Sequence, residues 1–248
     1  MDKDQRQSYI LKLLKEKQRV YISELLDQLN VSDDTLRRDL AYLDSMGLLT
    51  KVHGGAVAKS TVPMDFSDRL HYDIDQKQTL AAKVVPLFSP NDVILVDGGT
   101  SNLQVVKQLP DIPLTIYTNS FPVVQELLHK PHIDVVFLGG ELLRDSQVTV
   151  GFTVYRALQF LHPDWLLLGI CSVHPQIGLT APDREESYLK GLMIERAAKT
   201  IVMADNHKIN TAHQYLIGSL NDIDYLVVED NMKEEIRKNW KLGSYCLL

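Results

Sequence analysis

The chain has 248 residues, of which 45% are apolar and 23% charged, and its formal net charge at pH 7 is −6. This length suits one large domain or two of ordinary size. The acidic balance argues against a protein that coats nucleic acid along its whole length, and no run approaches the roughly 18–20 apolar residues that cross a bilayer. The N-terminal MDKDQRQ has no apolar stretch behind it and is not typical of a secretory signal. We expect a soluble, cytoplasmic protein.

The charge is unevenly distributed along the chain. Residues 1–60 hold 10 Lys+Arg and 9 Asp+Glu, a net of +1, so the remaining residues hold 16 and 23, a net of −7. A near-neutral N-terminal segment on an acidic body is compatible with local contact to DNA through that segment, but it does not establish such contact.

The cysteines and histidines give no indication of a metal, a disulfide or a cofactor. Cys171 and Cys246 lie in apolar, strand-like runs, which favours small buried hydrophobes in a reduced compartment. The eight histidines show no metal-ligand spacing.

Three helical patterns and a hairpin open the sequence. Apolar residues recur at helical spacing in residues 5–17, around 21–30, and from Ser32 to Gly47. Ser32 is a favoured N-cap residue, and the two aspartates after it suit the positive end of a helix dipole. LLTKVHGGAV then predicts two short strands folded at Gly54 and Gly55. We predict a winged helix-turn-helix domain over residues 1–58.

The rest of the chain predicts an α/β domain. Residues 59–75 are polar and contain Pro63, which indicates a linker that enters a helix at about 67–88. From residue 76 to 248, short apolar runs alternate with amphipathic stretches, which predicts a mostly parallel sheet covered on both faces. The runs are DVILVDGG, LTIYTN, IDVVFLGG, WLLLGI, TIVMAD and YLVVED. Ligands of such sheets bind at the carboxyl ends of the strands, where these polar clusters fall.

The third helix presents charge on its outer face. Leu36, Leu40 and Leu43 mark its buried side, and Arg38 lies opposite them. Guanidinium groups suit bidentate contact with guanine or phosphate, and wing residues can approach the neighbouring backbone or minor groove. The alternative is that Arg37 and Arg38 are solvated charges paired with Asp34 or Asp39. The candidate DNA-facing residues are Ser32, Asp34, Thr35, Arg37, Arg38, Lys51 and His53.

VILVDGGTSNLQVV is the most informative stretch of the body. A strand is followed by Gly98 and Gly99 and then by a helix that starts with Thr100 and Ser101. Glycines let backbone N–H groups point at an oxyanion, and the helix N-terminus adds partial positive charge. The alternative is an ordinary helix cap. The stretch is neither a dinucleotide fingerprint nor a P-loop, because the required spacing and Gly-Lys-Ser/Thr are absent.

Two lysine–carboxylate pairs lie where they can join this loop. Glu186 precedes Lys190 by four residues, and Asp205 and Lys208 follow the run TIVMAD. A lysine near the glycine loop would help to neutralise a phosphate dianion. The alternative for each pair is a surface ion pair or a solvated loop residue.

The N-terminal string resembles the DeoR-type helix-turn-helix closely. VSDDTLRRDLAYLDSMGLLTKVHGGA follows that family's pattern of Val-Ser, two variable residues, Thr, an apolar residue and Arg-Arg-Asp-Leu, and later His-Gly-Gly-Ala. The matching residues are Val31, Ser32, Thr35, Leu36, Arg37, Arg38, Asp39, Leu40, His53, Gly54, Gly55 and Ala56. The resemblance implies binding to double-stranded operator DNA.

From about residue 66 onward the chain is similar to the DeoR-type sensor domain, which resembles ribose-5-phosphate isomerase and the CoA transferases in fold. The resemblance implies a phosphorylated sugar as effector, with its phosphate on Gly99, Thr100 and Ser101. The candidate effector residues are Asp97, Gly98, Gly99, Thr100, Ser101, Asn119, Ser120, Gly139, Gly140, Glu186, Lys190, Asp205 and Lys208. Two departures are Ser101-Asn102 where the family repeats Thr, and Phe152 where it usually has Pro after Gly151.

A sugar-phosphate isomerase with a DNA-binding head is the alternative from another class. Aldose–ketose isomerisation needs a carboxylate placed to move a proton between adjacent carbons. The sequence between Trp165 and Val173, where the compared isomerase has Asp-Gly-Ala-Asp, contains no acid. We therefore expect a regulator, not an enzyme, acting most simply as a repressor; an activator or an architectural role is the further alternative. Paired half-sites predict a homo-oligomer, at least a dimer.

Overall fold

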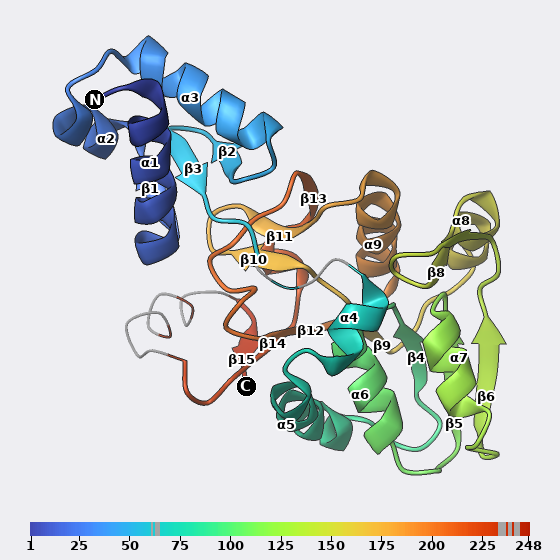
Figure 1. Cartoon of the computed structure of the whole chain (residues 1–248). Helices are drawn as coiled ribbons and strands as arrows, with labels where there is room; N and C mark the ends of the chain where they lie inside the picture. Colours follow the sequence, from blue (N-terminus) through green and yellow to red (C-terminus); the bar gives the residue numbers. More distant parts are fainter. Residues whose placement is uncertain (61, 63–64, 233–236, 238–239, 241–243) are drawn as a thin grey trace.

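The computed structural model describes residues 1–248 except 61, 63–64, 233–236, 238–239 and 241–243. Its N-terminal head, residues 1–58, contains three helices and a small sheet (Figure 1). The helices are α1 (Lys3–Lys17), α2 (Ile22–Leu29) and α3 (Asp33–Ser45). The strands are β1 (Arg19–Tyr21), β2 (Thr50–Val52) and β3 (Gly55–Val57), in the order β1-β3-β2. The winged helix-turn-helix prediction is confirmed.

The head is held together by an apolar core and one buried ion pair. Leu36 and Leu40 of α3 are fully buried against Ile10 of α1, as the helical spacing predicts. The Arg6 guanidinium of α1 pairs with the Asp39 carboxylate of α3, and both side chains are almost completely buried. Asp39 therefore fixes the angle between α1 and α3 and does not face solvent.

The wing, which is the β2–β3 hairpin of residues 50–57, differs from the prediction by one residue. Val52 pairs with Gly55, so the two turn residues are His53 and Gly54, and not the two glycines. Gly54 has φ +77°, which the left-handed turn requires. Gly55 begins β3, where an added Cβ would collide with the Val20 carbonyl of β1. β1 itself was not predicted.

The body contains a seven-stranded sheet in which all pairings are parallel, as predicted. Its strand order is β15-β14-β12-β9-β4-β5-β6. In chain order the strands are β4 (Val93–Val96), β5 (Leu114–Thr118), β6 (Ile133–Phe137), β9 (Trp165–Leu168), β12 (Lys199–Ala204), β14 (Tyr225–Val228) and β15 (Cys246–Leu247).

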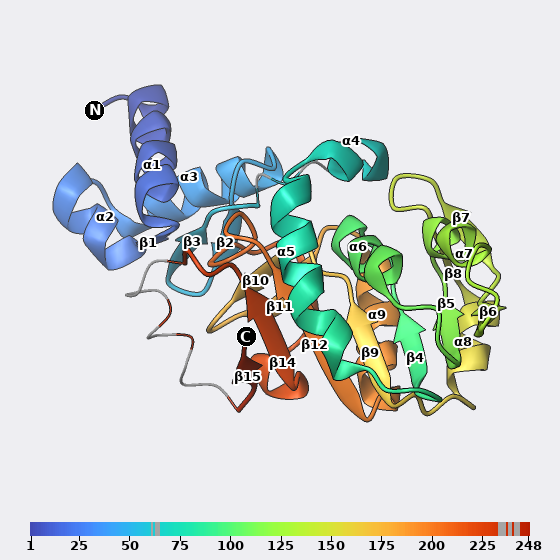
Figure 2. The ribbon, with the colours of Figure 1, turned by 90° about the horizontal axis from the view of Figure 1, so that it is seen from below.

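Helices cover both faces of this sheet, and alternate strand residues feed two separate cores (Figure 2). Ile94 and Val96 face the core under α5 (Ile74–Val84), α6 (Thr100–Gln108) and α7 (Phe121–Leu127). Leu95 faces the other core, under α8 (Phe152–Leu158) and α9 (Arg184–Arg196). The continuous apolar runs of the sequence reflect this burial on two sides.

The helix predicted at about 67–88 is in fact interrupted. α4 (Phe66–His71) ends before Tyr72, α5 begins at Ile74, and a short 3-10 helix covers Val85–Leu87. Asp73 between the helices has φ +47°, a left-handed conformation that no α-helix can contain. The break separates α5 from α4, which packs against α6.

Two smaller β elements were not predicted from the sequence. The hairpin of β7 (Glu141–Leu143) and β8 (Val148–Val150) lies beyond β6 in the chain. An antiparallel sheet of β10 (Ser172–His174), β11 (Gly178–Ala181) and β13 (Tyr215–Gly218) lies between the large sheet and the head (Figure 1). A 3-10 turn covers Leu220–Asp222.

The prediction of two buried cysteines is wrong for one of them. Cys171 is half-buried after β9, but Cys246 is exposed on the edge strand β15. Neither forms a disulfide. Within the described part of the chain, no helix is long and apolar enough to cross a membrane.

Candidate functional site

The outer face of α3 carries the predicted DNA-facing residues. Ser32 caps the helix: its hydroxyl accepts from the Thr35 N–H at 3.3 Å and lies 2.9 Å from the Thr35 hydroxyl. Arg37 pairs with Asp33 at 3.0 Å and Arg38 with Asp34 at 2.7 Å, all four side chains being exposed. The arginines thus have local partners, as the alternative interpretation expected, but in exposed pairs that are worth only about 0–1 kcal/mol each.

The wing and the next turn of α3 extend this surface. Lys51 on β2 and His53 in the turn are exposed, as expected. Tyr42, one helical turn after Arg38, is 45% exposed, and the Lys3 ammonium lies 4.3 Å from the centre of its ring. An exposed tyrosine on the charged side of a recognition helix is a signal that the sequence interpretation missed, since it followed only the charges.

A pocket in the body lies where β4, β9 and β12 end. Of the candidate effector residues, its wall includes Gly98, Gly99, Thr100, Ser101, Glu186, Lys190 and Lys208. It also includes residues that the sequence did not single out for it, among them Ser60, Val62, Arg69, Lys77, Ser146, Val148, Gly169, Cys171 and His213. The pocket thus joins segments from the linker to β13.

The glycine loop forms one wall and leaves a helix end open. β4 ends at Val96, Gly99 has φ +122°, and α6 begins at Thr100. The N-cap residue of α6, Gly99, has no side chain with which to cap the first turn. The hydroxyl-bearing Thr100 and Ser101 therefore stand at an uncapped helix N-terminus, where backbone N–H groups and the helix dipole favour an anion.

The Asn102 side chain holds this loop in place through hydrogen bonds to backbone carbonyls. Its amide nitrogen lies 3.0 Å from the Asp97 carbonyl oxygen, 3.2 Å from that of Gly98 and 3.0 Å from that of Leu167. The side chain is fully buried and its donors point into the protein. Asn102 belongs to the Ser101-Asn102 departure from the family's repeated Thr. It thus shapes the loop and does not donate to a ligand.

Close backbone packing explains two glycines of the pocket. An added Cβ on Gly98 would collide with the Val148 side chain of β8, and one on Gly169 would collide with the Gly98 carbonyl. Gly169, which follows β9, was not predicted. These approaches bring the ends of β4, β8 and β9 together around the loop.

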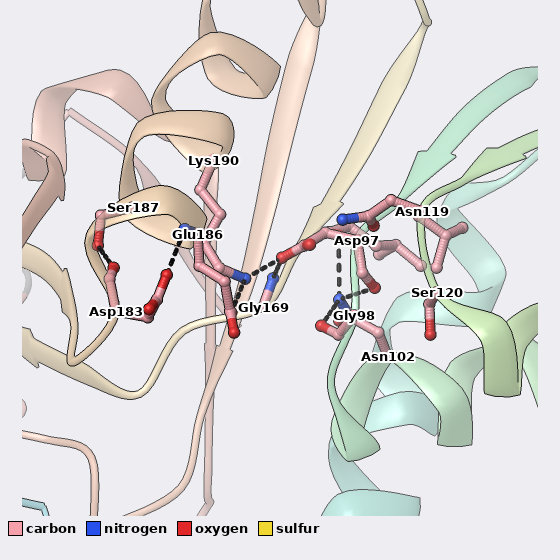
Figure 3. A network of polar contacts seen from close by, with 12 residues as sticks. Asp97, Gly98, Asn102, Asn119, Ser120, Gly169, Asp183, Glu186, Ser187 and Lys190 are labelled. Carbon is pink, nitrogen blue, oxygen red and sulfur yellow. Dashed lines mark hydrogen bonds and ion pairs between the residues drawn. The ribbon is translucent and has the colours of Figure 1, made fainter. Parts of the chain in front are cut away.

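Lys190 reaches from α9 to a buried carboxylate (Figure 3). Its ammonium pairs with Asp97 and lies 3.7 Å from the Glu186 carboxylate. Asp97 also accepts the backbone N–H of Gly169 at 3.0 Å. Burial alone would lower the pKa of Lys190, but the two carboxylates outweigh it and raise the pKa. Lys190 therefore stays charged in the wall, while Asp97 lies behind it as its counter-ion.

Lys208, in the turn that follows β12 (Lys199–Ala204), has a similar arrangement. Its ammonium lies 3.3 Å from the Asp205 carboxylate, which is 1% exposed. Burial would raise the pKa of Asp205, but the positive charge of Lys208 outweighs it and lowers the pKa. Asp205 is thus, like Asp97, a support behind a pocket lysine.

Lys77 of α5 is a buried cation that the sequence interpretation missed. Its ammonium donates to the Arg69 carbonyl at 2.6 Å and to the Tyr72 carbonyl, both at the C-terminal end of α4. Burial, and then the nearby charge of Lys208, lower the pKa of Lys77 to about 8. Lys77 could have been found from its spacing, because it lies one turn before Leu80 on the apolar side of a helix.

Four predicted effector residues lie outside the pocket wall, and three of them contact the β7–β8 hairpin. Asn119 donates to the Thr149 carbonyl at 3.2 Å, and Ser120 forms a β-bridge with Val148. An added Cβ on Gly140 would collide with the Val150 carbonyl, and Gly139 lies beside it in the chain. The structure therefore places Asn119, Ser120 and Gly140 against the hairpin that carries Ser146 and Val148 into the pocket, whereas an added Cβ on Gly139 would meet open space.

The charge of the wall indicates an anionic ligand. Arg69, Lys77, Lys190 and Lys208 line it together with the carboxylate of Glu186. His213 is neutral, because burial and then the charge of Lys59 lower its pKa to about 4. No group of three or more His, Cys, Asp or Glu that could hold a metal ion occurs among the residues that the structure describes.

The two halves of the molecule match two family models. Residues 6–62 match the DeoR-like helix-turn-helix domain, and residues 72–230 match the DeoR C-terminal sensor domain. The chain belongs to the DeoR family of transcriptional regulators. The resemblance inferred from the sequence is confirmed, and so is the expectation of a regulator that is not an enzyme.

Relatives of this DeoR-family chain align over nearly its whole length. It is 31% identical to the HTH-type transcriptional regulator YulB of Bacillus subtilis over 92% of this chain and 89% of that protein. It is 28% identical to the HTH-type transcriptional repressor GlcR of Bacillus subtilis, over 92% and 89%. It is 29% identical to the lactose phosphotransferase system repressor of Staphylococcus epidermidis, over 99% and 98%.

Solved structures similar to this DeoR-family chain include ribose-5-phosphate isomerases. One, a D-ribose-5-phosphate isomerase in complex with phospho-erythronic acid, is 16% identical with a TM-score of 0.38, over 54% of this chain and 53% of that chain. The ribose 5-phosphate isomerase A of Methanocaldococcus jannaschii is 15% identical with a TM-score of 0.41, over 54% of each.

Proposed function

We propose that this protein represses an operon for carbohydrate use and is released from its operator by a phosphorylated sugar. α3 and the wing bind the operator through the candidate residues Ser32, Asp34, Thr35, Arg37, Arg38, Lys51 and His53. The body binds the effector at the pocket. A relative named as a lactose phosphotransferase system repressor supports a carbohydrate role, and a role in the regulation of transcription supports a cytoplasmic location.

The observation that carries the effector proposal is the pairing of an uncapped glycine-loop helix with four cations. Gly99, Thr100 and Ser101 offer backbone and hydroxyl donors at one wall. Lys190 of α9 and Lys208 of the turn after β12 supply charge, and each is fixed by a buried carboxylate behind it. A phosphate dianion satisfies both halves of this arrangement, because it accepts several hydrogen bonds and carries about two negative charges.

The pocket binds its ligand without converting it. Leu168, the last residue of β9, and the next three residues, Gly169, Ile170 and Cys171, line the pocket, and none of them supplies the carboxylate that would move a proton between carbons. The carboxylate in the wall, Glu186, lies 3.7 Å from the Lys190 ammonium. A bound sugar phosphate is therefore held as a signal.

A homodimer, or a higher homo-oligomer, presents two heads to paired half-sites. Helix-turn-helix proteins read half-sites about one helical turn of DNA apart, and most soluble oligomers are symmetric. Effector binding then changes operator affinity by changing how the two heads are held. To change operator affinity tenfold, the effector needs about 1.4 kcal/mol of differential affinity between the two arrangements.

Removal of one hydroxyl tests the pocket with little disturbance. Ser101→Ala leaves every buried ion pair intact, so the fold should persist. One hydrogen bond to a charged group contributes about 1.5–3 kcal/mol, and affinity for sugar phosphates should fall about 10- to 100-fold. The measurement is calorimetric titration with ribose 5-phosphate, glucose 6-phosphate, fructose 6-phosphate and galactose 6-phosphate.

Thr153→Ala is the matched control. Thr153 occupies the same position in α8 as Ser101 does in α6, and α8 also follows a glycine with positive φ. Its side chain is exposed and away from the pocket wall. Equal affinity of the Ser101→Ala, Thr153→Ala and unmodified proteins would place the phosphate elsewhere.

A further inference from the structure

Residues 208–213 form a connector that lines the pocket at both ends and contacts the head in between. Lys208 and His213 both line the pocket. Between them, the Ala212 N–H donates to the Ala58 carbonyl at 3.1 Å, and the Ala212 carbonyl accepts from the Thr50 hydroxyl at 2.7 Å. Thr50 lies in the wing and is buried. The residue next to a pocket side chain is therefore bonded to the head through both of its peptide groups.

The connector is fixed along its length to the small antiparallel sheet. The Thr211 hydroxyl donates to the Lys208 carbonyl at 2.8 Å and lies 2.9 Å from the Ser172 hydroxyl of β10. The His213 N–H donates to the Thr180 hydroxyl of β11 at 2.9 Å. A segment held by these hydrogen bonds has little conformational freedom, so a displacement of His213 also displaces Ala212.

His213 offers the pocket a neutral imidazole. The residue is 7% exposed, and at neutral pH one ring nitrogen is a donor and the other an acceptor. No hydrogen bond to either ring nitrogen occurs within the described part of the chain. Such a group suits a sugar hydroxyl, which both donates and accepts, better than it suits a phosphate.

The linker supplies the neighbouring wall. Ser60 and Val62 line the same pocket and follow β3 of the wing by a few residues. These linker side chains line the pocket in an arrangement in which the head lies against the body. A ligand that touches both His213 and Ser60 therefore makes more contacts in this docked arrangement than in any other.

We propose that the sugar end of the effector binds between His213 and Ser60 and so holds the wing against the body through Ala212. The inference rests on the proposed function. A ligand shifts an equilibrium toward the state in which it makes more contacts. The phosphate end anchors any sugar phosphate in the glycine loop, whereas the His213 end selects the sugar that acts. A head held in one orientation cannot adjust to its half-site, and operator affinity falls.

Hydrogen exchange of the full chain, followed by mass spectrometry, tests this inference. The probes are the four sugar phosphates named above and inorganic phosphate. A sugar phosphate that binds should slow exchange at residues 50–58 of the wing at least threefold. Inorganic phosphate has no atoms to reach His213, so it should protect residues 98–103 and leave the wing unchanged.

Two variants separate the pocket from the link. His213→Ala should lower sugar-phosphate affinity about tenfold, leave inorganic phosphate affinity unchanged and remove the wing response. Thr50→Val should keep sugar-phosphate affinity within about twofold and also remove the wing response. Thr115→Val, at a half-buried strand position in β5, is the matched control and should respond as the unmodified protein does.

Each outcome decides one level of the account. A sugar phosphate that binds without slowing exchange in the wing overturns this inference and leaves the proposed function standing. Inorganic phosphate that slows the wing equally overturns it too, because the sugar end would then be irrelevant. Failure of every sugar phosphate to bind contradicts the proposed function, and the inference falls with it. The comparison of probes on the unmodified protein needs no variant to fold.

Discussion

Two ion pairs mark the two working surfaces of the molecule, and they differ in burial. On α3, the side chains of Arg38 and Asp34 are 80% and 70% exposed, whereas those of Lys190 and Asp97 in the body are 6% and 1% exposed. Breaking an exposed pair costs about 0–1 kcal/mol, but removing one partner of a buried pair costs about 3–5 kcal/mol. Arg38 can exchange Asp34 for DNA, while Lys190 is held in place for a ligand.

The difference separates two ways of recognising phosphate. The head offers mobile charges that rearrange on a large, regular polyanion, where binding is gained from many contacts. The body offers charges fixed in advance by Asp97 and Asp205. Such preorganisation suits a small ligand, because its few contacts must offset the translational and rotational entropy that it loses on binding. The following predictions test this contrast, from the largest effect to the smallest.

Lys190→Met should destabilise the body most. It leaves the Asp97 carboxylate buried without its cation, so the free energy of unfolding should fall by about 3–5 kcal/mol. Urea denaturation measures this fall. The double variant Lys190→Met with Asp97→Asn should recover much of the loss, since residue 97, the more deeply buried of the two partners of Lys190, is then uncharged. A loss below about 1 kcal/mol would show that the pair is solvated, like the one on α3.

Arg38→Ala should weaken operator binding and spare the fold. Loss of a base contact costs about 1–3 kcal/mol, a fall of roughly 5- to 150-fold in affinity, while unfolding should change by less than about 1 kcal/mol. Fluorescence anisotropy with labelled operator DNA measures the first and urea denaturation the second. Arg156→Ala, an exposed arginine on α8, is the control. Unchanged operator affinity would remove Arg38 from the interface.

The pH dependence of stability should reveal the buried Lys77. Its pKa falls from 10.5 to about 8 on folding, so between those values the unfolded chain holds more protons and stability rises with pH. The unfolding free energy of the unmodified protein relative to Lys77→Met should therefore increase from pH 8 to pH 10, by at most about 1.4 kcal/mol per pH unit. A difference that is flat or falls over this range would contradict the burial of its charge.

Asp34→Asn should have the smallest effect on stability. It removes the partner of Arg38 from an exposed pair, so the unfolding free energy should change by less than about 1 kcal/mol. Asp33→Asn, which frees Arg37 in the same way, gives the comparison within the same helix. A larger loss in urea denaturation would mean that the α3 pairs hold the recognition helix together, and the contrast with the body would fail.

The sequence predicted elements whose signals are local and strong. Ser32 caps α3 and the leucine stripe faces the core, because both follow from helix geometry. β1 escaped notice because three residues are too few for a periodic pattern, and Asp73 broke the predicted helix without a glycine or proline to mark the point. The strand ends of the parallel sheet could be read, since each apolar run stops at a polar cluster.

The site was only partly predictable for a related reason. The glycine loop and the two lysines carry motifs, so they were found. Lys77, Ser146 and His213 line the pocket because elements distant in sequence pack together. No local sequence pattern predicts such packing. Asn119, Ser120, Gly139 and Gly140 were assigned to the ligand and lie outside the pocket wall; three of them, Asn119, Ser120 and Gly140, contact the β7–β8 hairpin, which the sequence did not predict.

Operator binding in the presence of sugar phosphates tests the central claim most directly. Labelled DNA from the region upstream of the gene for this protein is titrated with the unmodified chain, and the anisotropy is measured alone, with each sugar phosphate and with the matching unphosphorylated sugar. The account predicts that at least one sugar phosphate lowers operator affinity tenfold or more, about 1.4 kcal/mol, and that its unphosphorylated sugar does not. Operator affinity that no sugar phosphate changes, or that the unphosphorylated sugar lowers equally, would contradict it.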